Sequence, residues 1–276
     1  MNECFQKVFL LDGKSFPCNE FRSDLVYDHM SIYEVIRIID GVPLFQDDHF
    51  DRLFETARIK NLKIILERSV LAGEMNRLIS FNKVKTGNIK IVLTFNEDAA
   101  SHHRQIYFIE HYYPKKEQYL KGVTAILYQA ERMRPAAKVI NHRLRSSIFG
   151  KLIDTGAYEA FLVDRSGCIT EGSRSNVFFI SNDEIYTAPD GEVLSGIVRK
   201  YVLKYCDNHG IPVHFCKVRT RDLSGYQSCF LTGTSPGVLP VSRIGQISLH
   251  PGHKLMLDIM QGYQEMVQDY IHQFKV

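Results

Sequence analysis

Three segments of the chain carry residue types that could do chemistry together. Glu171 lies in TEGSRSNVFFI, where small hydroxyl residues and a glycine precede the β-branched and aromatic run of a predicted strand. Lys138 lies 33 residues earlier, between alanines and β-branched residues. The third segment, LSGIVRKYVLKYC, has the pattern of a helix that starts at Ser195. A carboxylate, a desolvated amine and a helix N-terminus could respectively fix a charge, attack a carbonyl and bind an anion.

Lys138 and Glu171 each have a chemical and a plainer interpretation. Desolvation lowers the pKa of an ammonium, and the neutral amine can attack an aldehyde to form a Schiff base. Lys138 could equally extend into solvent from a helix start. Glu171 could keep a pyridine nitrogen protonated, so that the ring accepts electrons from a substrate carbon, or it could be a solvated turn carboxylate. Combined with an anion site, the chemical interpretations describe a pyridoxal-phosphate (PLP) site.

The start of the third segment could bind a phosphate. Ser195 is a suitable N-cap for the predicted helix. The backbone amides of Ile197 and Val198 would then point out of the positive end of the helix dipole. Every helix has such an end, so this segment indicates an anion site only in combination with the others.

Two further segments could reach an anion. Arg52, in HFDRL, lies beside the apolar face of a predicted helix, and a guanidinium can bind phosphate with two parallel hydrogen bonds. An ion pair with Asp48 is the alternative for this arginine. Thr234 and Ser235 end a predicted strand at a glycine-rich turn, where amides and hydroxyls can converge on an anion. Both residue types are also common in ordinary turns.

Composition narrows the class of protein. The 276 residues suffice for two modest domains, and 45% hydrophobic and 24% charged residues are ordinary for a globular protein. The net charge of +3 and the scattered basic residues do not indicate nucleic-acid binding. No apolar run approaches the ~18 residues of a membrane span, and the N-terminus lacks a signal-peptide core. We therefore expect a cytoplasmic protein without nucleic-acid or membrane partners.

The six cysteines are spread along the chain without CxxC or zinc-ligand spacing. They are Cys4, Cys18, Cys168, Cys206, Cys216 and Cys229. In a cytoplasmic protein we expect all six to be reduced and structural. No metal site is expected.

Hydrophobic periodicity and turn residues predict a mixture of strands and helices in two domains. The expected strands are a hairpin over 8–16 turning at Asp12-Gly13, then 88–95, 105–113, 122–128, 158–164, 176–181, 184–187, 212–216, 228–234 and 238–244. The expected helices are 47–61 with Asp47 or Asp48 as cap, 69–79, one from about 140, 195–208, and a long amphipathic helix from about 251. The Pro-led, lysine-rich segment PKKEQY suggests a junction between domains 1–117 and 118–276.

Five blocks, in this order, resemble the class IV (fold-type IV) aminotransferases, which include branched-chain aminotransferase, D-amino acid aminotransferase and aminodeoxychorismate lyase. The blocks are YEVIRIIDGVPLFQDDHFDRL, AAKVIN, YEAFLVDRSGCITEGSRSNVFFI, LSGIVR and TGTSPGVLPV. The resemblance covers most of the chain. It implies a D-amino acid aminotransferase-like fold of the α/β and α+β classes, with a small α/β domain (1–117) and a larger pseudo-barrel, PLP-binding domain (118–276).

The resemblance also implies roles for individual residues. Lys138 would form the Schiff base and carry the proton between the substrate Cα and the cofactor, and Glu171 would pair with the pyridine nitrogen. The phosphate would be held by Arg52, the amides of Ile197 and Val198, and Thr234. Tyr33 and Ser235 would contact the substrate. Members of the family are usually homodimers, so a homodimer is expected here.

Some positions depart from the family pattern. Residue 143 is arginine where branched-chain enzymes usually place a tyrosine, and the spacing to Asn141 is closer to that of the lyase and D-amino acid enzymes. His102, His103 and Arg104 could recognise an acidic substrate or lie at a hairpin tip. These departures bear on the substrate and not on the cofactor.

The leading hypothesis is a PLP-dependent aminotransferase that moves an amino group between an amino acid and a 2-oxo acid. A second hypothesis is a 4-amino-4-deoxychorismate lyase that releases pyruvate and 4-aminobenzoate. Both use the same cofactor residues, so these motifs do not separate them. A third hypothesis, a related protein that binds or regulates without catalysis, conflicts with the presence of both Lys138 and Glu171.

Overall fold

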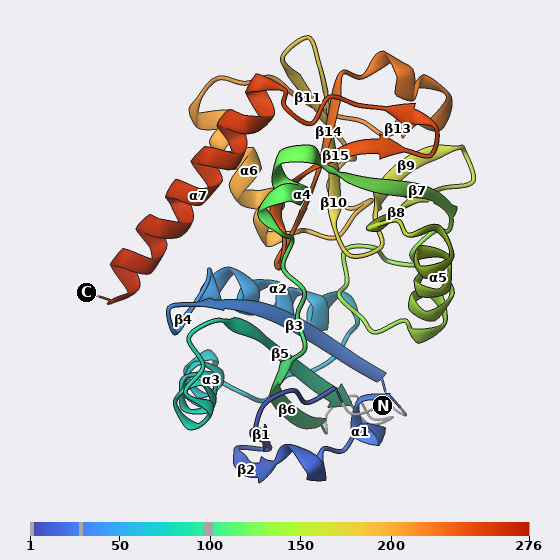
Figure 1. The fold of residues 1–276 in the computed structure, drawn as a ribbon. Coiled ribbons are helices and arrows are strands. Elements are labelled where there is room, and N and C mark those ends of the chain that lie inside the picture. The colour runs from blue at the N-terminus through green and yellow to red at the C-terminus, as the bar shows by residue number, and fades with distance from the viewer. Residues whose placement is uncertain (1–2, 28–29, 96–101, 276) are drawn as a thin grey trace. The chain divides into compact units, whose positions relative to one another are not determined.

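The computed structural model describes residues 3–27, 30–95 and 102–275. The chain divides into two compact units (Figure 1). The first unit contains residues up to Tyr112, the short segment Ala137–Ile140 and the C-terminal residues from Gln268, and the second contains the rest. The predicted boundary after residue 117 falls inside helix α4 (Lys116–Lys121). Residues 137–140 group with the first unit, whereas the predicted domains are each continuous in sequence.

The first unit is built on a six-stranded antiparallel sheet in the order β2-β1-β6-β5-β3-β4. Its strands are β1 (Val8–Leu11), β2 (Lys14–Pro17), β3 (Met30–Ile39), β4 (Val42–Pro43), β5 (Gly87–Phe95) and β6 (His102–Ile109). The turn of the first hairpin has positive φ at Asp12 and Gly13, as the predicted turn requires. The strand predicted at 105–113 begins and ends earlier than expected.

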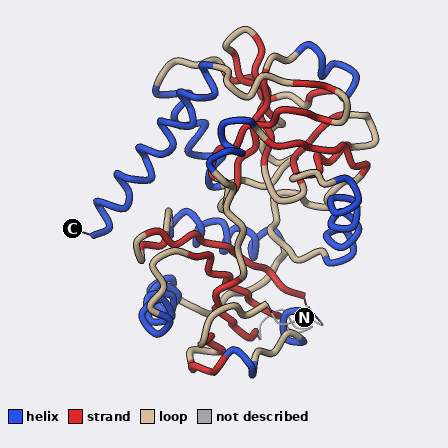
Figure 2. Tube along the Cα trace, viewed as in Figure 1, coloured by secondary structure: helices blue, strands red, loops and turns tan. Residues whose placement is uncertain are grey.

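Helices cover one face of this sheet (Figure 2). These helices are α2 (Gln46–Ile59) and α3 (Arg68–Asn82). Two short helical turns, η1 (Cys18–Glu20) and α1 (Asp24–Tyr27), come before β3 in the chain. Phe50 and Leu53 of α2 and Leu71 of α3 pack in the same core as the strand residues Ile36 and Ile91. The apolar residues at helical spacing in both helices therefore face this core.

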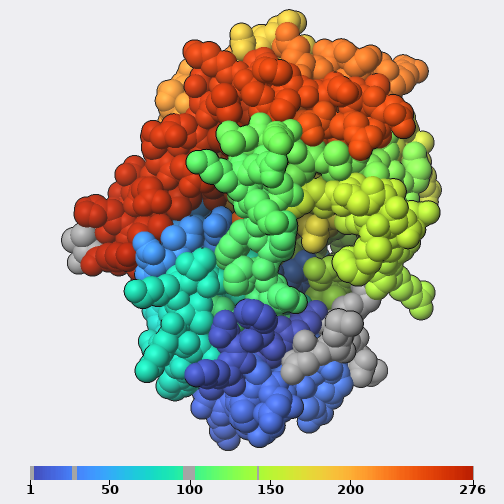
Figure 3. Space-filling view, viewed as in Figure 1, coloured from blue at the N-terminus to red at the C-terminus, as the bar shows by residue number. Residues whose placement is uncertain are grey.

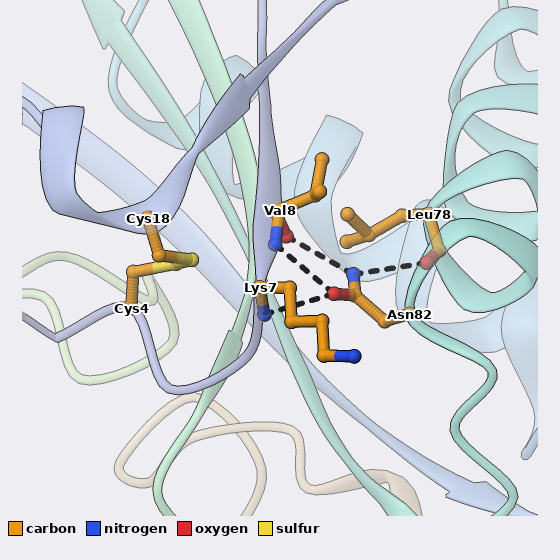
Figure 4. The surroundings of a disulfide bond; sticks show 6 residues. All are labelled: Cys4, Lys7, Val8, Cys18, Leu78 and Asn82. Carbon is orange, nitrogen blue, oxygen red and sulfur yellow. Dashed lines mark hydrogen bonds between the residues drawn. A yellow bond between two sulfur atoms is a disulfide. The ribbon is translucent and has the colours of Figure 1, made fainter.

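The N-terminal segment is joined to the helical turn η1, which follows the first hairpin, by a disulfide between Cys4 and Cys18 (Figure 4). The two Cα atoms are 5.6 Å apart, which is within the range for a disulfide. The expectation that all six cysteines are reduced was wrong, because the hairpin returns Cys18 to the start of the chain, where its amide donates to the carbonyl of Lys7. Asn82 also fixes this segment by bonding to the backbone of Lys7 and Val8.

The second unit is built on a ten-stranded mixed sheet, in the order β12-β11-β10-β14-β15-β7-β8-β9-β13 with β16 beside β15. Its strands are β7 (Val123–Gln129), β8 (Glu159–Val163), β9 (Cys168–Gly172), β10 (Asn176–Ser181), β11 (Glu184–Thr187), β12 (Val213–Phe215), β13 (Val218–Arg219), β14 (Ser228–Gly233), β15 (Gly237–Ile244) and β16 (Ile247–Ser248). β7 pairs in parallel with both β8 and β15. β9, the strand that carries Glu171, is not among the strands predicted from the sequence.

The helices of the second unit are α4, α5 (His142–Thr155), α6 (Ile197–Asn208), the turn η2 (Thr220–Gly225) and most of α7 (Lys254–Lys275). Helix α4 packs on β15, and the Tyr119 hydroxyl donates to the carbonyl of Pro236 at 2.7 Å. Figure 3 shows the green surface of this region beside the red surface of the C-terminal part of the unit. The apolar stripe of α7 is buried at Met256, Ile259 and Tyr263, as its amphipathic pattern predicts.

Two predicted helix caps were wrong. Helix α2 follows Phe45, which has a left-handed backbone (φ 50°) and no side-chain cap bond, and Asp47 and Asp48 lie in the first turn. Carboxylates there still stabilise the positive end of the helix. Helix α6 is preceded by Gly196, not capped by Ser195.

Candidate active site

Lys138 lies on an extended segment at the edge of β3 and not at a solvated helix start. The amide of Tyr33 donates to the carbonyl of Lys138 at 3.2 Å, and Ile32 pairs with Val139 in an isolated bridge. The Lys138 amide donates to Thr56 Oγ1 at 3.3 Å. Its Nζ lies 5.0 Å from the centre of the Tyr33 ring. The structure thus brings together the predicted reactive lysine and the predicted substrate-lining tyrosine.

Arg52 is buried in the first unit and pairs with Glu34, a partner not predicted from the sequence. Its Nε and Nη2 donate to the two oxygens of Glu34, both at 2.7 Å. His49 Nδ1 donates to the same carboxylate at 2.8 Å. Removing one member of such a buried network typically costs about 3–5 kcal/mol, because a charge is left buried without its partner. This network fixes the orientation of Arg52.

The charges in this network shift the pKa of two of its members. Burial alone would raise the pKa of Glu34, but the adjacent Arg52 and His49 hold it well below its usual range. Burial lowers the pKa of His49, and the charges of Arg52 and Lys138 lower it further, against the opposing effect of Glu34. His49 is therefore neutral near pH 7 and donates through Nδ1. An acidic residue between Ile32 and Ile36 on the core face of a strand was the signal in the sequence that could have identified Glu34.

Glu171 lies on β9 in the second unit with its carboxylate buried. Arg132 Nη1 donates to Oε1 at 2.9 Å, and the Leu194 amide donates to Oε2 at 3.0 Å. The alternative of a solvated turn carboxylate is therefore wrong. Arg132 is not among the site residues predicted from the sequence.

The start of α6 is connected to Glu171 through Leu194. The carbonyl of Leu194 accepts from Asn176 Nδ2 and from the Gly196 amide, both at 2.8 Å. Helix α6 then begins at Ile197 without a side-chain cap, so its first amides lack partners within the helix. A buried carboxylate and the start of helix α6 are thus held by one short segment.

A second buried carboxylate shapes the loop that follows Glu171. Glu159 Oε1 accepts from the amide and hydroxyl of Ser173, and Oε2 accepts from the hydroxyl of Ser175. Because Ser175 is directly followed by Asn176, Glu159 supports the segment that orients Leu194. No pattern in the sequence distinguished Glu159 from an ordinary strand residue.

The remaining predicted positions have the following places in the structure. Thr234 and Ser235 lie in the turn between β14 and β15, partly exposed. Two strand residues earlier, the buried hydroxyl of Thr232 has no hydrogen-bond partner among the described residues. His103 pairs with Asp12, and Arg104 pairs with Glu74, so both have structural partners. The rest of that loop, 96–101, lies outside the described residues.

Each unit contains residues that fit one part of a PLP cofactor. The first unit presents the Lys138 amine over an aromatic ring. The second presents a buried carboxylate for a ring nitrogen and helix amides for a phosphate. Among the described residues, no group of three or more His, Cys, Asp or Glu side chains is arranged to hold a metal ion. No helix in the described part of the chain is long and apolar enough to cross a membrane.

Comparison with known proteins gives the family. The family model described as "Amino-transferase class IV" matches residues 31–244. This chain belongs to the class IV aminotransferase family. The D-alanine aminotransferase of Bacillus licheniformis is 30% identical to it over 223 residues, which cover 77% of this chain and 78% of that protein. The family match confirms the resemblance seen in the sequence and makes this aminotransferase a PLP-dependent enzyme.

Solved structures share the fold. A branched-chain aminotransferase from the archaeon Thermoproteus uzoniensis, crystallised with norvaline, superposes with a TM-score of 0.84 at 22% identity, covering 96% of this chain and 96% of that one. A protein described as "Putative 4-amino-4-deoxychorismate lyase" from Legionella pneumophila has a TM-score of 0.77 at 19% identity, covering 87% and 92%. These likenesses confirm the predicted fold class.

The network around Glu34 predicts how the stability of the aminotransferase changes with pH. His49 stays neutral when folded and becomes protonated when unfolded below its ordinary pKa of 6.5, so its contribution is present above pH 6.5 and is lost as the pH falls. As the pH falls, the free energy of unfolding of His49→Asn, which keeps a donor to Glu34, should decrease less steeply than that of the wild type. We expect the difference to be up to about 1.4 kcal/mol per pH unit. Urea unfolding at pH 7 and pH 5 measures it.

The exposed His272→Asn is the matched control and should behave like the wild type. Below pH 4.5 both variants should still lose stability, because the lowered pKa of Glu34 makes its carboxylate protonate more readily on unfolding. An identical pH dependence of wild type and His49→Asn between pH 7 and 5 would contradict the assignment of a neutral His49.

Proposed function

We propose that this aminotransferase uses Lys138 to hold the cofactor and Glu171 to hold its ring nitrogen, and that it acts on an amino acid and a 2-oxo acid. The observation that carries the proposal is the buried Glu171 carboxylate, tied through Leu194 to the start of α6. In the proposal, the carboxylate pairs with the pyridinium nitrogen and the start of α6 binds the phosphate, so the two groups must be held at a fixed separation. The two hydrogen bonds to Glu171 keep it in place between turnovers.

When bound, PLP withdraws electrons from the bond that joins the substrate Cα to its hydrogen. Lys138 holds the cofactor in the resting enzyme. The neutral amine of Lys138 would accept the proton from the substrate Cα and return it during the transfer of the amino group. Thr56 and the β3 edge fix the backbone of Lys138, so that only its side chain moves during this transfer.

The other residues bind and orient. In the proposal, the amides of Ile197 and Val198, Arg52 and Thr234 hold the phosphate, and Glu34 keeps the Arg52 guanidinium in a single orientation. The ring of Tyr33 lines the substrate side of Lys138, which is supported by the 5.0 Å separation of the ring centre and Nζ. Ser235 is proposed to offer its amide to the substrate carboxylate.

Lys138→Ala should lose the covalent link to the cofactor. The purified variant is expected to be colourless, and borohydride, which fixes the cofactor to the wild-type chain, should leave none attached. Activity should fall at least about a hundredfold, because the proton carrier is also lost. Lys151→Ala, at an exposed position of α5, is the control and should stay yellow and active. If mass spectrometry finds the cofactor still attached to Lys138→Ala, the assignment of Lys138 as the cofactor-linked lysine is wrong.

A lyase of the same family is the second candidate. The likeness to the Legionella pneumophila structure supports it at the level of the fold. The Asn141 spacing does not, because Asn141 Oδ1 accepts from the Leu144 amide at 3.2 Å and so caps α5. Arg143, where branched-chain enzymes usually have a tyrosine, is exposed on the same helix.

A spectral screen of amino donors tests the two candidates. We expect several amino acids, in the D or L series, to convert the yellow aldehyde form of the enzyme to the colourless amine form, and a 2-oxo acid to restore the colour. D-Alanine is the first donor to test, since the B. licheniformis relative is a D-alanine aminotransferase. No spectral change with any amino acid, together with release of pyruvate from aminodeoxychorismate alone, would contradict the aminotransferase and support the lyase.

We also propose a cytoplasmic homodimer. The family resemblance supports the dimer, and the ordinary composition of the chain is the basis for the expected location. Light scattering should give twice the 31.8 kDa mass of the chain. A mass equal to that of one chain would exclude the dimer.

A further inference from the structure

A buried lysine lies on the face of the first sheet that also carries Tyr33. Lys90, in the central strand β5, is only 3% exposed. Its Nζ lies 5.5 Å from the centre of the Tyr33 ring and 5.7 Å from that of Tyr107. An ammonium taken out of water needs a counter-charge, because aromatic rings replace only part of its hydration.

The counter-charge comes from the N-terminal segment. Glu3 Oε2 lies 2.5 Å from Lys90 Nζ, and the Tyr107 hydroxyl donates to the same oxygen at 3.0 Å. Glu3 is in no strand or helix and its side chain is 29% exposed. Lys90 and Tyr107 therefore form a carboxylate site that is filled by Glu3, a residue of the same chain.

This site is next to the reactive lysine. Lys90 Nζ and Lys138 Nζ lie 5.5 Å and 5.0 Å from the centre of one ring, that of Tyr33, and all of these residues belong to the first unit. The carboxylate of Glu3 is thus bound one aromatic ring away from the amine that we assign to the cofactor. A substrate with an acidic side chain would find its counter-charge at Lys90.

Covalent and backbone links keep Glu3 in place. Cys4 follows it directly and is joined to Cys18 by the disulfide (Figure 4). Cys4 also pairs with Ile109, and the Phe5 amide donates to the carbonyl of Phe108 at 2.9 Å. A tethered carboxylate has a high effective concentration at its site, so it competes well with a free ligand.

We propose that Glu3 is an internal competitor that occupies Lys90 in place of the carboxylate of an acidic substrate. The inference rests on the proposed function, since it takes Lys138 as the reactive lysine. The occupant that displaces Glu3 is a dicarboxylate, one carboxylate of which binds to Lys90 and Tyr107. The disulfide sets the strength of the competition. A dithiol reductant supplies two electrons and two protons, the Cys4–Cys18 bond breaks, two thiols form, and the reductant becomes its cyclic disulfide.

Binding of glutarate, an unreactive dicarboxylate, to the PLP-loaded enzyme tests the proposal. By calorimetry, Glu3→Gln should bind glutarate about tenfold more tightly than the wild type, and Lys90→Met about tenfold more weakly, because a charge-assisted hydrogen bond is gained or lost. Glu20→Gln, an exposed acid of the same N-terminal region, is the control and should match the wild type. Equal affinities of wild type and Glu3→Gln would overturn the proposal.

Cys18→Ser provides a second route that leaves both charged residues in place. It should bind glutarate several-fold more tightly than the wild type, and dithiothreitol should bring the wild type to the same affinity. If Glu3→Gln does not fold, unchanged binding by Cys18→Ser and by the reduced wild type overturns the proposal. If these variants bind glutarate more tightly but no donor in the screen gives amino transfer, the proposed function is rejected. The proposal that Glu3 occupies a carboxylate site at Lys90 would then still stand.

Discussion

A charged side chain removed from water must be given a partner, and this constraint organises both units of the molecule. The cost of an unpaired buried charge is several kcal/mol, comparable to the whole stability of a domain. In the first unit Glu34 is matched by Arg52 and His49. In the second unit Glu171 is matched by Arg132 and a backbone amide. The groups that could serve catalysis are therefore also groups on which folding depends.

This pairing fixes the orientation of the buried carboxylates in the candidate site. Each buried carboxylate accepts at least two hydrogen bonds, which leaves it one favourable orientation. Glu159 extends the same principle to the backbone, because its bonds to Ser173 and Ser175 hold the loop after β9. Preorganised charges of this kind need no reorganisation when charge develops in a reaction.

The sequence predicted the elements better than the partners within them. Alternation and helical spacing correctly located the core faces of α2 and α3, because burial of apolar residues has a period that can be read directly. Glu171 and Lys138 were identified as candidates because small or apolar neighbours made them unusual. The partner Arg132 was missed, since a pairing between residues far apart in sequence leaves no local pattern. Glu34 was missed although its place between Ile32 and Ile36 marks it as a charge on the core face of a strand. The helix caps failed for a related reason, as backbone conformation at Phe45 and Gly196 replaced the expected side-chain bonds.

The edge pairing of Lys138 with β3 has a consequence for folding. Ile32 and Val139 are roughly a hundred residues apart in sequence, so their bridge closes a long loop. Contacts of such high sequence separation carry a large entropic cost and tend to form late. The strands around β3 must already be assembled before the lysine segment has an edge to join. A partly folded or truncated chain therefore lacks a positioned Lys138 even where its local structure is intact, which makes this lysine a reporter of complete folding.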